Sequence, residues 1–272
     1  MASCWIITLC CYRISQTHDR ILTGRDVPDA VPSKGSDLEK TSLAWKSDSY
    51  IQENWSSLLD VVYNKFASNP VKELLAAGSV TSTSTIECAM AELIKNVESM
   101  KKVQEELKIE LSENDYLKES QLLQMSYVQA CVKETLKLPA LLLLPHHAIE
   151  TCQVMSHTIP KDAQVLVNVW AITRDPLIWE DPEMFRPQRF LSSYMDFKGN
   201  DFEFLPFSAG RRKCPGMPMA AIKIPLVLGS LVHFFDWELS HGKCPIELDM
   251  TEKFGVTLQK KEPLLLIPKA RK

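Results

Sequence analysis

The sequence has no excess of basic residues and no CxxC pair of cysteines. Its 272 residues contain 31 Lys and Arg against 34 Asp and Glu, which gives a formal net charge of −3. This balance lacks the basic footprint of a nucleic-acid-binding domain. The eight cysteines form no CxxC pair, which argues against a zinc site or a disulfide framework and favours a reducing compartment.

Long apolar runs are also missing from the start of the chain. The stretch MASCWIITLCC is far shorter than the ~20 residues of a membrane span, and no basic segment precedes it. We therefore expect neither a signal peptide nor a membrane anchor there. The overall composition, 45% hydrophobic and 24% charged residues, is that of an ordinary globular protein.

The pattern of apolar residues predicts a mainly α fold with a small β portion. Helical periodicity without proline predicts one long helix passing into a charged second helix over residues 71–111. A shorter amphipathic helix is expected over 126–138, ended by Pro139, and a long apolar helix is expected after Cys214. Residues 1–70 are heterogeneous and predict an irregular N-terminal region, separate from a domain over residues 71–272.

Strands are expected in two places. Alternating and β-branched residues over 146–175 predict short antiparallel strands with a turn at Pro160–Asp162. The tail over 254–272 predicts one hairpin. Between these stretches, residues 175–206 are rich in proline and aromatic residues and predict an irregular meander.

The segment PFSAGRRKCPG contains one cysteine, Cys214, after two arginines and among turn-forming residues. Taken alone, such a cysteine is more often a small buried hydrophobic side chain than a ligand. However, adjacent cations and a following helix N-terminus both favour an ionised thiol. We therefore interpret Cys214 as a metal-binding thiolate.

The spacing of this segment, FxxGxRxCxG, resembles the cysteine loop of the cytochrome P450 superfamily. The resemblance implies that Cys214 is the proximal ligand of a haem iron and that Arg212 pairs with a haem propionate. It also implies that Phe207 covers the sulfur, while Gly210 and Gly216 let the backbone turn and approach the macrocycle closely. The cofactor expected from the resemblance is haem b, with a thiolate that favours O–O cleavage.

The segment KETLKL places Glu134 and Lys137 on one helical face. By themselves they would form a solvated ion pair of small consequence. In the family this position is ExxR, whose glutamate and arginine pair with an arginine of the meander, here Arg189 in FRPQRF. We expect Glu134, Lys137 and Arg189 to form this structural triad, with a lysine in place of the forked arginine.

Two further positions carry weaker signals. In AAGSVTS, Gly78 and Thr81 match the family motif at which oxygen binds and protons are managed, while Val80 stands where an acid is usual. The same stretch could equally be a helix-packing notch. His146 matches a basic residue that reaches a haem propionate in the family, although a bare His pair is more often exposed or structural.

The resemblance extends from about residue 71 to 268 and points to the plant microsomal branch, which hydroxylates terpenoids, alkaloids and phenylpropanoids. It implies a monooxygenase that inserts one oxygen atom into a small lipophilic substrate, with electrons from an NADPH-dependent flavoprotein reductase. We expect a monomer that does not bind nucleic acid. The family implies the cytosolic face of the endoplasmic reticulum membrane, whereas the lack of a clear anchor implies the cytoplasm.

The segment between residues 50 and 71 is shorter than the family requires, which predicts a truncated and internally deleted chain. Two alternatives therefore stand beside the monooxygenase. One is a non-catalytic remnant that binds haem or the reductase, and the other is a fragment that does not fold.

Overall fold

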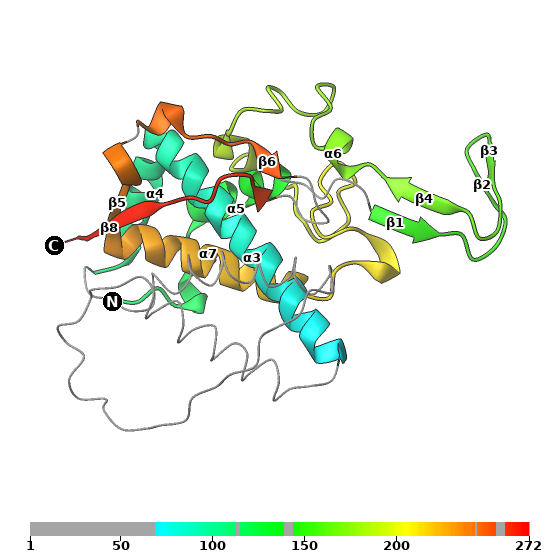
Figure 1. Ribbon diagram of the computed structural model, residues 1–272, viewed down its shortest axis with the longest axis horizontal. Coiled ribbons are helices and arrows are strands. Elements are labelled where there is room, and N and C mark those ends of the chain that lie inside the picture. Colours follow the sequence, from blue (N-terminus) through cyan, green and yellow to red (C-terminus); the bar gives the residue numbers. More distant parts are fainter. Residues whose placement is uncertain (1–68, 113–114, 139–143, 243, 254–258, 272) are drawn as a thin grey trace, which may run out of the picture. The chain divides into compact units, whose positions relative to one another are not determined.

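The computed structural model describes residues 69–112, 115–138, 144–242, 244–253 and 259–271 (Figure 1). Nearly all of the expected N-terminal region 1–70 lies outside them. The chain divides into two compact units, Met1–Thr83 and Ser84–Lys272, and the boundary falls inside helix α3. The predicted domain boundary at residue 70 stays a prediction.

Two consecutive helices follow from the proline-poor run after residue 70, as predicted. Helix α3 spans Asn69–Lys95 and helix α4 spans Val97–Glu110. They are separated at Asn96, whose backbone leaves the helical region and whose side chain donates to the Glu92 carbonyl at 2.8 Å. Helix α4 buries Ser99, Val103 and Leu107, which recur every four residues and form one face.

Helix α5 spans Ser126–Lys137 and confirms the predicted amphipathic helix. Its first turn is stabilised by Glu106 of α4, whose two carboxylate oxygens accept the backbone N–H groups of Tyr127 at 2.8 Å and Val128 at 2.9 Å. A carboxylate is favourable here because the N-terminus of a helix has free N–H groups and a positive electrostatic end.

Helix α7 spans Met217–Phe234 and packs against α4 and α5. Gly229 allows close packing there, because an added Cβ would lie 2.7 Å from Leu117 Cδ2, in the segment between α4 and α5, and 3.6 Å from Leu107 Cδ2 of α4. Among the described helices, α7 is long and apolar enough to cross a membrane by length and composition alone. Its buried residues, including Ile224, Leu228 and Val232, belong to the core that it shares with α4 and α5.

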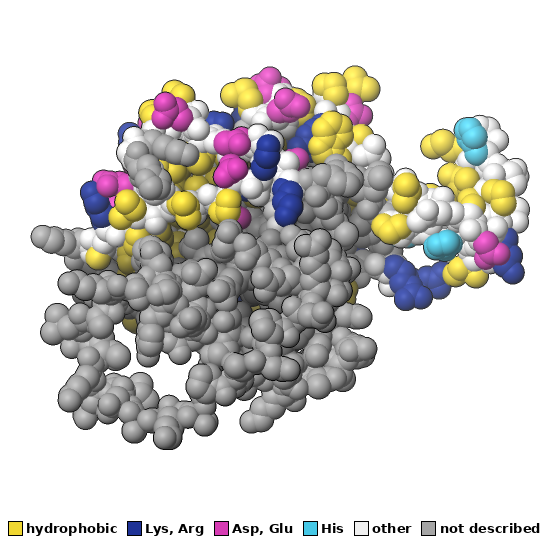
Figure 2. Space-filling model, in the orientation of Figure 1, with side chains coloured by type: hydrophobic (Ala, Val, Ile, Leu, Met, Phe, Trp, Pro, Cys, Tyr) yellow, Lys and Arg dark blue, Asp and Glu magenta, His cyan; other side chains and the backbone are white. Residues whose placement is uncertain are grey.

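The strands after α5 pair as predicted (Figure 1). Strand β1 (Leu144–His147) pairs antiparallel with β4 (Gln164–Val167), and β2 (Cys152–Val154) pairs antiparallel with β3 (His157–Ile159). The expected turn at 160–162 connects β3 to β4 and uses a left-handed Asp162, with φ of +64°. Apolar side chains lie exposed on the β2–β3 hairpin (Figure 2), among them Val154 and Met155. The end of this region departs from the prediction and forms a short helix, α6 (Val169–Ile172).

The described strands of the C-terminal tail pair with segments outside the tail and not with each other, so the predicted single hairpin over 254–272 is wrong for the described residues. Strand β8 (Leu266–Ala270) pairs with β5 (Phe235–Leu239), which continues directly from α7. Strand β7 (Gln259–Lys260) pairs with β6 (Glu252–Lys253). The reason is that β5 offers an alternating edge of Phe235, Trp237 and Leu239, which a tail hairpin would leave uncovered.

The meander over residues 175–206 is irregular, as predicted, apart from the 3-10 turn η2 (Pro187–Phe190). Its aromatic side chains form a compact group in which Trp179, Phe190 and Phe204 lie with ring centroids 5.2 to 6.3 Å apart. Element η2 packs against α5. The remaining short 3-10 turns are η1 (Glu119–Gln121), η3 (Gly210–Arg212), η4 (Ser240–Gly242) and η5 (Pro245–Glu247). The described residues form helices and small two-stranded sheets, which confirms the predicted fold class, mainly α with a small β portion.

Candidate functional site

Cys214 lies in a closed loop immediately before α7. Its backbone N–H donates to the Phe207 carbonyl at 2.9 Å, which closes the loop, and the helix begins at Met217. The thiol is free and exposed, and the residues just before it, Arg211, Arg212 and Lys213, are exposed as well. The sequence therefore places an accessible sulfur beside cations and a helix N-terminus, which both favour a thiolate.

Backbone conformation explains one of the two glycines in the predicted motif. Gly210 has φ of +71°, where glycine avoids the strain that a side chain would cause. Gly216 has φ of −81°, and an added Cβ would meet only Cys214 Sγ, at 3.7 Å. Ser208 also adopts a left-handed conformation, with φ of +63°, although it carries a side chain. The loop is thus strained at Ser208 and relaxed at Gly216.

The other described cysteines have less suitable surroundings. Burial raises the pKa of the Cys88 thiol to about 12 and raises that of Cys131 as well, which keeps both thiols protonated. Cys152 and Cys244 are exposed like Cys214, but neither stands beside an arginine or ahead of a long helix, because Cys152 lies on strand β2 and Cys244 directly precedes the three-residue turn η5. Within the described ranges, Cys214 is therefore the cysteine best suited to bind a metal as a thiolate.

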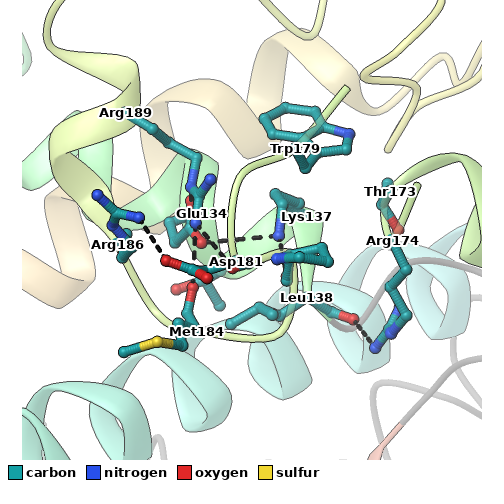
Figure 3. Close-up of polar contacts among 12 residues, drawn as sticks. Glu134, Lys137, Leu138, Thr173, Arg174, Trp179, Asp181, Met184, Arg186 and Arg189 are labelled. Carbon is teal, nitrogen blue, oxygen red and sulfur yellow. Dashed lines mark hydrogen bonds and ion pairs between the residues drawn. The ribbon is translucent and has the colours of Figure 1, made fainter. Parts of the chain in front are cut away.

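Glu134, Lys137 and Arg189 meet in the interior (Figure 3), as the triad hypothesis expects. Both Glu134 and Lys137 are fully buried, and Lys137 Nζ lies 3.7 Å from Glu134 Oε1. Arg189 Nε lies 3.0 Å from Glu134 Oε2. The carboxylate is held by two cations, one on its own helix and one on η2, and this arrangement attaches the meander to α5.

The two cations also bind backbone carbonyls of the meander. Lys137 donates to the Pro182 carbonyl. Arg189 donates to the carbonyls of Glu180, Asp181 and Met184, at 2.6, 3.2 and 3.3 Å. The Lys137 ammonium faces the Trp179 ring, with Nζ 5.3 Å from the ring centroid. Together these contacts hold an irregular segment that has almost no secondary structure of its own.

Burial shifts the pKa values of Glu134 and Lys137 toward their neutral forms. Burial raises the pKa of Glu134, although Lys137 and Arg189 oppose that shift. Burial lowers the pKa of Lys137 to about 8, with Glu134 acting in the opposite direction. The ammonium is therefore retained at neutral pH with a smaller margin than an arginine would have.

The predicted distal residues lie on α3. The Thr81 hydroxyl donates to the Ala77 carbonyl at 2.7 Å, and Thr81 is exposed, whereas Val80 is buried. An added Cβ on Gly78 would meet no described atom within 4 Å, so the helix-packing explanation gains no support among the described residues. The predicted roles of Gly78 and Thr81 stay predictions.

His146 lies on β1, half-buried, opposite Val165 of β4. Its predicted contact with a haem propionate stays a prediction, as do the cofactor-binding roles of Phe207, Arg212 and the two loop glycines.

The residues around Cys214 fit a haem. In the described part of the chain, no three His, Cys, Asp or Glu side chains converge as a metal-binding group. A porphyrin would supply four nitrogen ligands to an iron on Cys214, and its anionic propionates suit a loop with exposed arginines. An exposed thiol also leaves the sulfur open to the iron.

The profile of the family described as cytochrome P450 matches residues 66–267, which include α3, the triad and the cysteine loop. The chain belongs to the cytochrome P450 family. It is 53% identical over 201 residues to the probable (S)-N-methylcoclaurine 3'-hydroxylase isozyme 2 of Coptis japonica, covering 73% of this chain and 41% of that protein. It is 48% identical over 194 residues to the geraniol 8-hydroxylase of Swertia mussotii, covering 71% of this chain and 39% of the relative.

Among solved structures, a zebrafish cytochrome P450 with abiraterone superposes with a TM-score of 0.64 at 31% identity, covering 73% of this chain and 46% of the other. Another relative, the (S)-N-methylcoclaurine 3'-hydroxylase isozyme 1 of Eschscholzia californica, is matched over 50% of its length. The chain therefore spans about half the length, or less, of the curated relatives it matches, and the expectation of a partial cytochrome P450 fold is confirmed.

Proposed function

We propose that this chain binds haem b through the Cys214 thiolate and acts as a haem-thiolate monooxygenase. The observation that carries the proposal is the free, exposed Cys214 in a loop closed onto Phe207, beside exposed arginines and ahead of a long helix. Within this proposal, the triad of Glu134, Lys137 and Arg189 fixes the meander to α5 so that the fold can hold the cofactor.

A few residues of the chain carry this scheme. Cys214 would hold the iron through its sulfur, and Arg212 would pair with a propionate, an interaction that a guanidinium can make with two parallel hydrogen bonds. The Thr81 hydroxyl, which now donates to the Ala77 carbonyl, would turn to deliver a proton. Val80 cannot assist, because its side chain has no ionisable group. The bound haem would supply oxygen activation.

The substrate is proposed to be a small lipophilic plant metabolite of the terpenoid, alkaloid or phenylpropanoid class. Supporting this, the relatives include proteins named N-methylcoclaurine and geraniol hydroxylases. Electrons would come from NADPH through a flavoprotein reductase. We place the chain on the cytosolic face of the endoplasmic reticulum or in the adjacent cytoplasm, as a monomer.

A second candidate is a haem-binding or reductase-binding remnant without catalysis. It is favoured by Val80, a buried side chain on α3 that has no ionisable group where the family has an acid. In that case the chain would hold haem without directed proton delivery, and electrons from NADPH would be lost to peroxide.

The experiment that separates the candidates is a reconstituted assay with reductase, NADPH and a panel of lipophilic terpenoids and alkaloids. NADPH, peroxide and hydroxylated product are counted together. Product formed in step with NADPH supports the monooxygenase. NADPH consumption that yields peroxide supports a haem-binding remnant without productive catalysis. A chain that takes up no haem contradicts both the monooxygenase and the haem-binding remnant, and a pull-down with the reductase then tests the reductase-binding remnant.

A further inference from the structure

Residues 195–200, just before the cysteine loop, touch that loop at two points. The Phe197 ring meets the Phe207 ring edge-on, with centroids 5.5 Å apart and planes inclined at 73°. Two residues further on, Gly199 has φ of +86°, and an added Cβ would lie 2.9 Å from the Ser208 carbonyl oxygen. The same Cβ would lie 3.2 Å from Ala209 Cα. A side chain therefore cannot fit at Gly199 unless the loop moves.

The same residues are attached to α5. Lys133 Nζ donates to the Met195 carbonyl at 2.9 Å and lies 4.0 Å from the Asp196 carboxylate. The Asp201 carboxylate accepts the Asp196 N–H at 2.7 Å, which closes the segment into a turn. We call residues 195–200 the support segment, because they connect a core helix to the cysteine loop.

The contact of Phe197 with Phe207 affects the position of Cys214. The Phe207 carbonyl accepts the Cys214 N–H, so a displacement of Phe207 shifts the backbone that carries Sγ. Phe207 and Phe197 also share a small cavity with Val132 of α5 and Ala220 of α7. The loop is strained at Ser208, where the backbone is left-handed, and Gly199 packs on the carbonyl of that residue. Strain of this kind persists only where neighbouring structure holds it.

We propose that the support segment positions the Cys214 sulfur, with Phe197 and Gly199 acting as positioning residues for the haem-thiolate bond. The inference rests on the proposed function in one respect, because it assumes that Cys214 binds iron. The mechanical part, that residues 195–200 hold the loop closed, is independent of any cofactor.

The mechanical part is tested on the haem-free full chain by hydrogen exchange with mass spectrometry. The chain offers a matched control for Gly199→Ala, because Gly242 also has a positive φ, +64°, but an added Cβ there meets nothing within 4 Å. Both alanine variants carry the left-handed strain, and only Gly199→Ala pushes on the loop. We expect amide exchange in the peptide covering Phe207–Gly216 to speed up about tenfold in Gly199→Ala and to stay unchanged in Gly242→Ala.

A second pair of variants keeps the proposal testable if Gly199→Ala does not fold. Phe197→Leu removes the ring contact, while Phe202→Leu changes an exposed phenylalanine nearby. Faster loop exchange in Phe197→Leu than in Phe202→Leu supports the proposal. Equal loop exchange within each pair overturns it.

The functional part is tested on the haem-loaded chain from the reduced carbon monoxide complex. We expect the two support-segment variants to convert part of the thiolate-type Soret band into the band of a complex without thiolate, and the two controls to keep the wild-type spectrum. A merely structural role would lower the melting temperature without this conversion, and that result would overturn the positioning role. Failure of the proposed function looks different, since the wild-type chain would then lack the thiolate band and the exchange comparison would still decide whether the segment holds the loop.

Discussion

Raising the pH from 7 to about 9.5 should stabilise this chain relative to its Lys137→Arg variant. Lys137 is fully buried, forms an ion pair with Glu134 and donates to the Pro182 carbonyl. Burial lowers the pKa of its ammonium from 10.5 to about 8. A free lysine in the unfolded chain keeps its ordinary pKa.

The sign follows from the proton count in the two states. Between pH 8 and 10.5 the folded chain has lost the Lys137 proton while the unfolded chain still holds it, so stability rises with pH in this window. Integrating to about pH 9.5 gives a gain of about 2 kcal/mol in the free energy of unfolding. Arginine stays charged throughout this range and gives no such gain at position 137.

The assay is urea unfolding of the wild-type chain and the Lys137→Arg variant at matched pH values from 7 upward. Other titrating groups are common to both chains, so the difference between their free energies of unfolding isolates residue 137. That difference should change by about 2 kcal/mol in favour of the wild type across the window. A difference that stays flat would mean that Lys137 is not buried beside Glu134 as described.

Three further predictions concern stability at neutral pH. Lys137→Arg should raise the free energy of unfolding by about 1 kcal/mol. A guanidinium could hydrogen-bond Glu134, which Lys137 Nζ approaches only to 3.7 Å, while still donating to the Pro182 carbonyl; calorimetry showing a lower melting temperature would contradict this. Ser208→Gly should stabilise the chain by about 1 kcal/mol by relieving the left-handed backbone, which denaturant unfolding measures, and a destabilised variant would show that the strain is absent. Glu134→Gln should lower the free energy of unfolding by about 3 kcal/mol, since two cations lose their counter-charge inside the fold; a variant as stable as the wild type would refute the triad.

Much of the fold was predictable where one local signal dominates. The proline-poor run after residue 70 predicted two helices, and the structure separates them at Asn96. The alternating residues near Pro160 predicted antiparallel strands, which form with the turn at the expected place. The cysteine before a long apolar run predicted a thiol ahead of a helix N-terminus, and Cys214 lies two residues before the Gly216 cap of α7.

The predictions that were wrong, and the features that the sequence did not indicate, depend on contacts between distant segments. The pairing of β8 with β5 joins residues about thirty apart in the chain, and the tail sequence alone does not identify its partner. The sequence suggested the pairing of Glu134 with Lys137 and Arg189 through a family motif, but not the carbonyls of the meander that both cations bind. The left-handed Ser208 and the contact of Phe197 with Phe207 have no local signature, because a serine and a phenylalanine fit many environments.

The central claim is that Cys214 binds the haem iron as a thiolate. The most direct test is the absorbance spectrum of the reduced carbon monoxide complex of the haem-loaded chain, compared with Cys214→Ser and with Cys152→Ser, which alters another exposed free cysteine. We expect the wild type and Cys152→Ser to show the thiolate-type Soret band and Cys214→Ser to lose it. A Cys214→Ser variant that keeps this band would contradict the assignment.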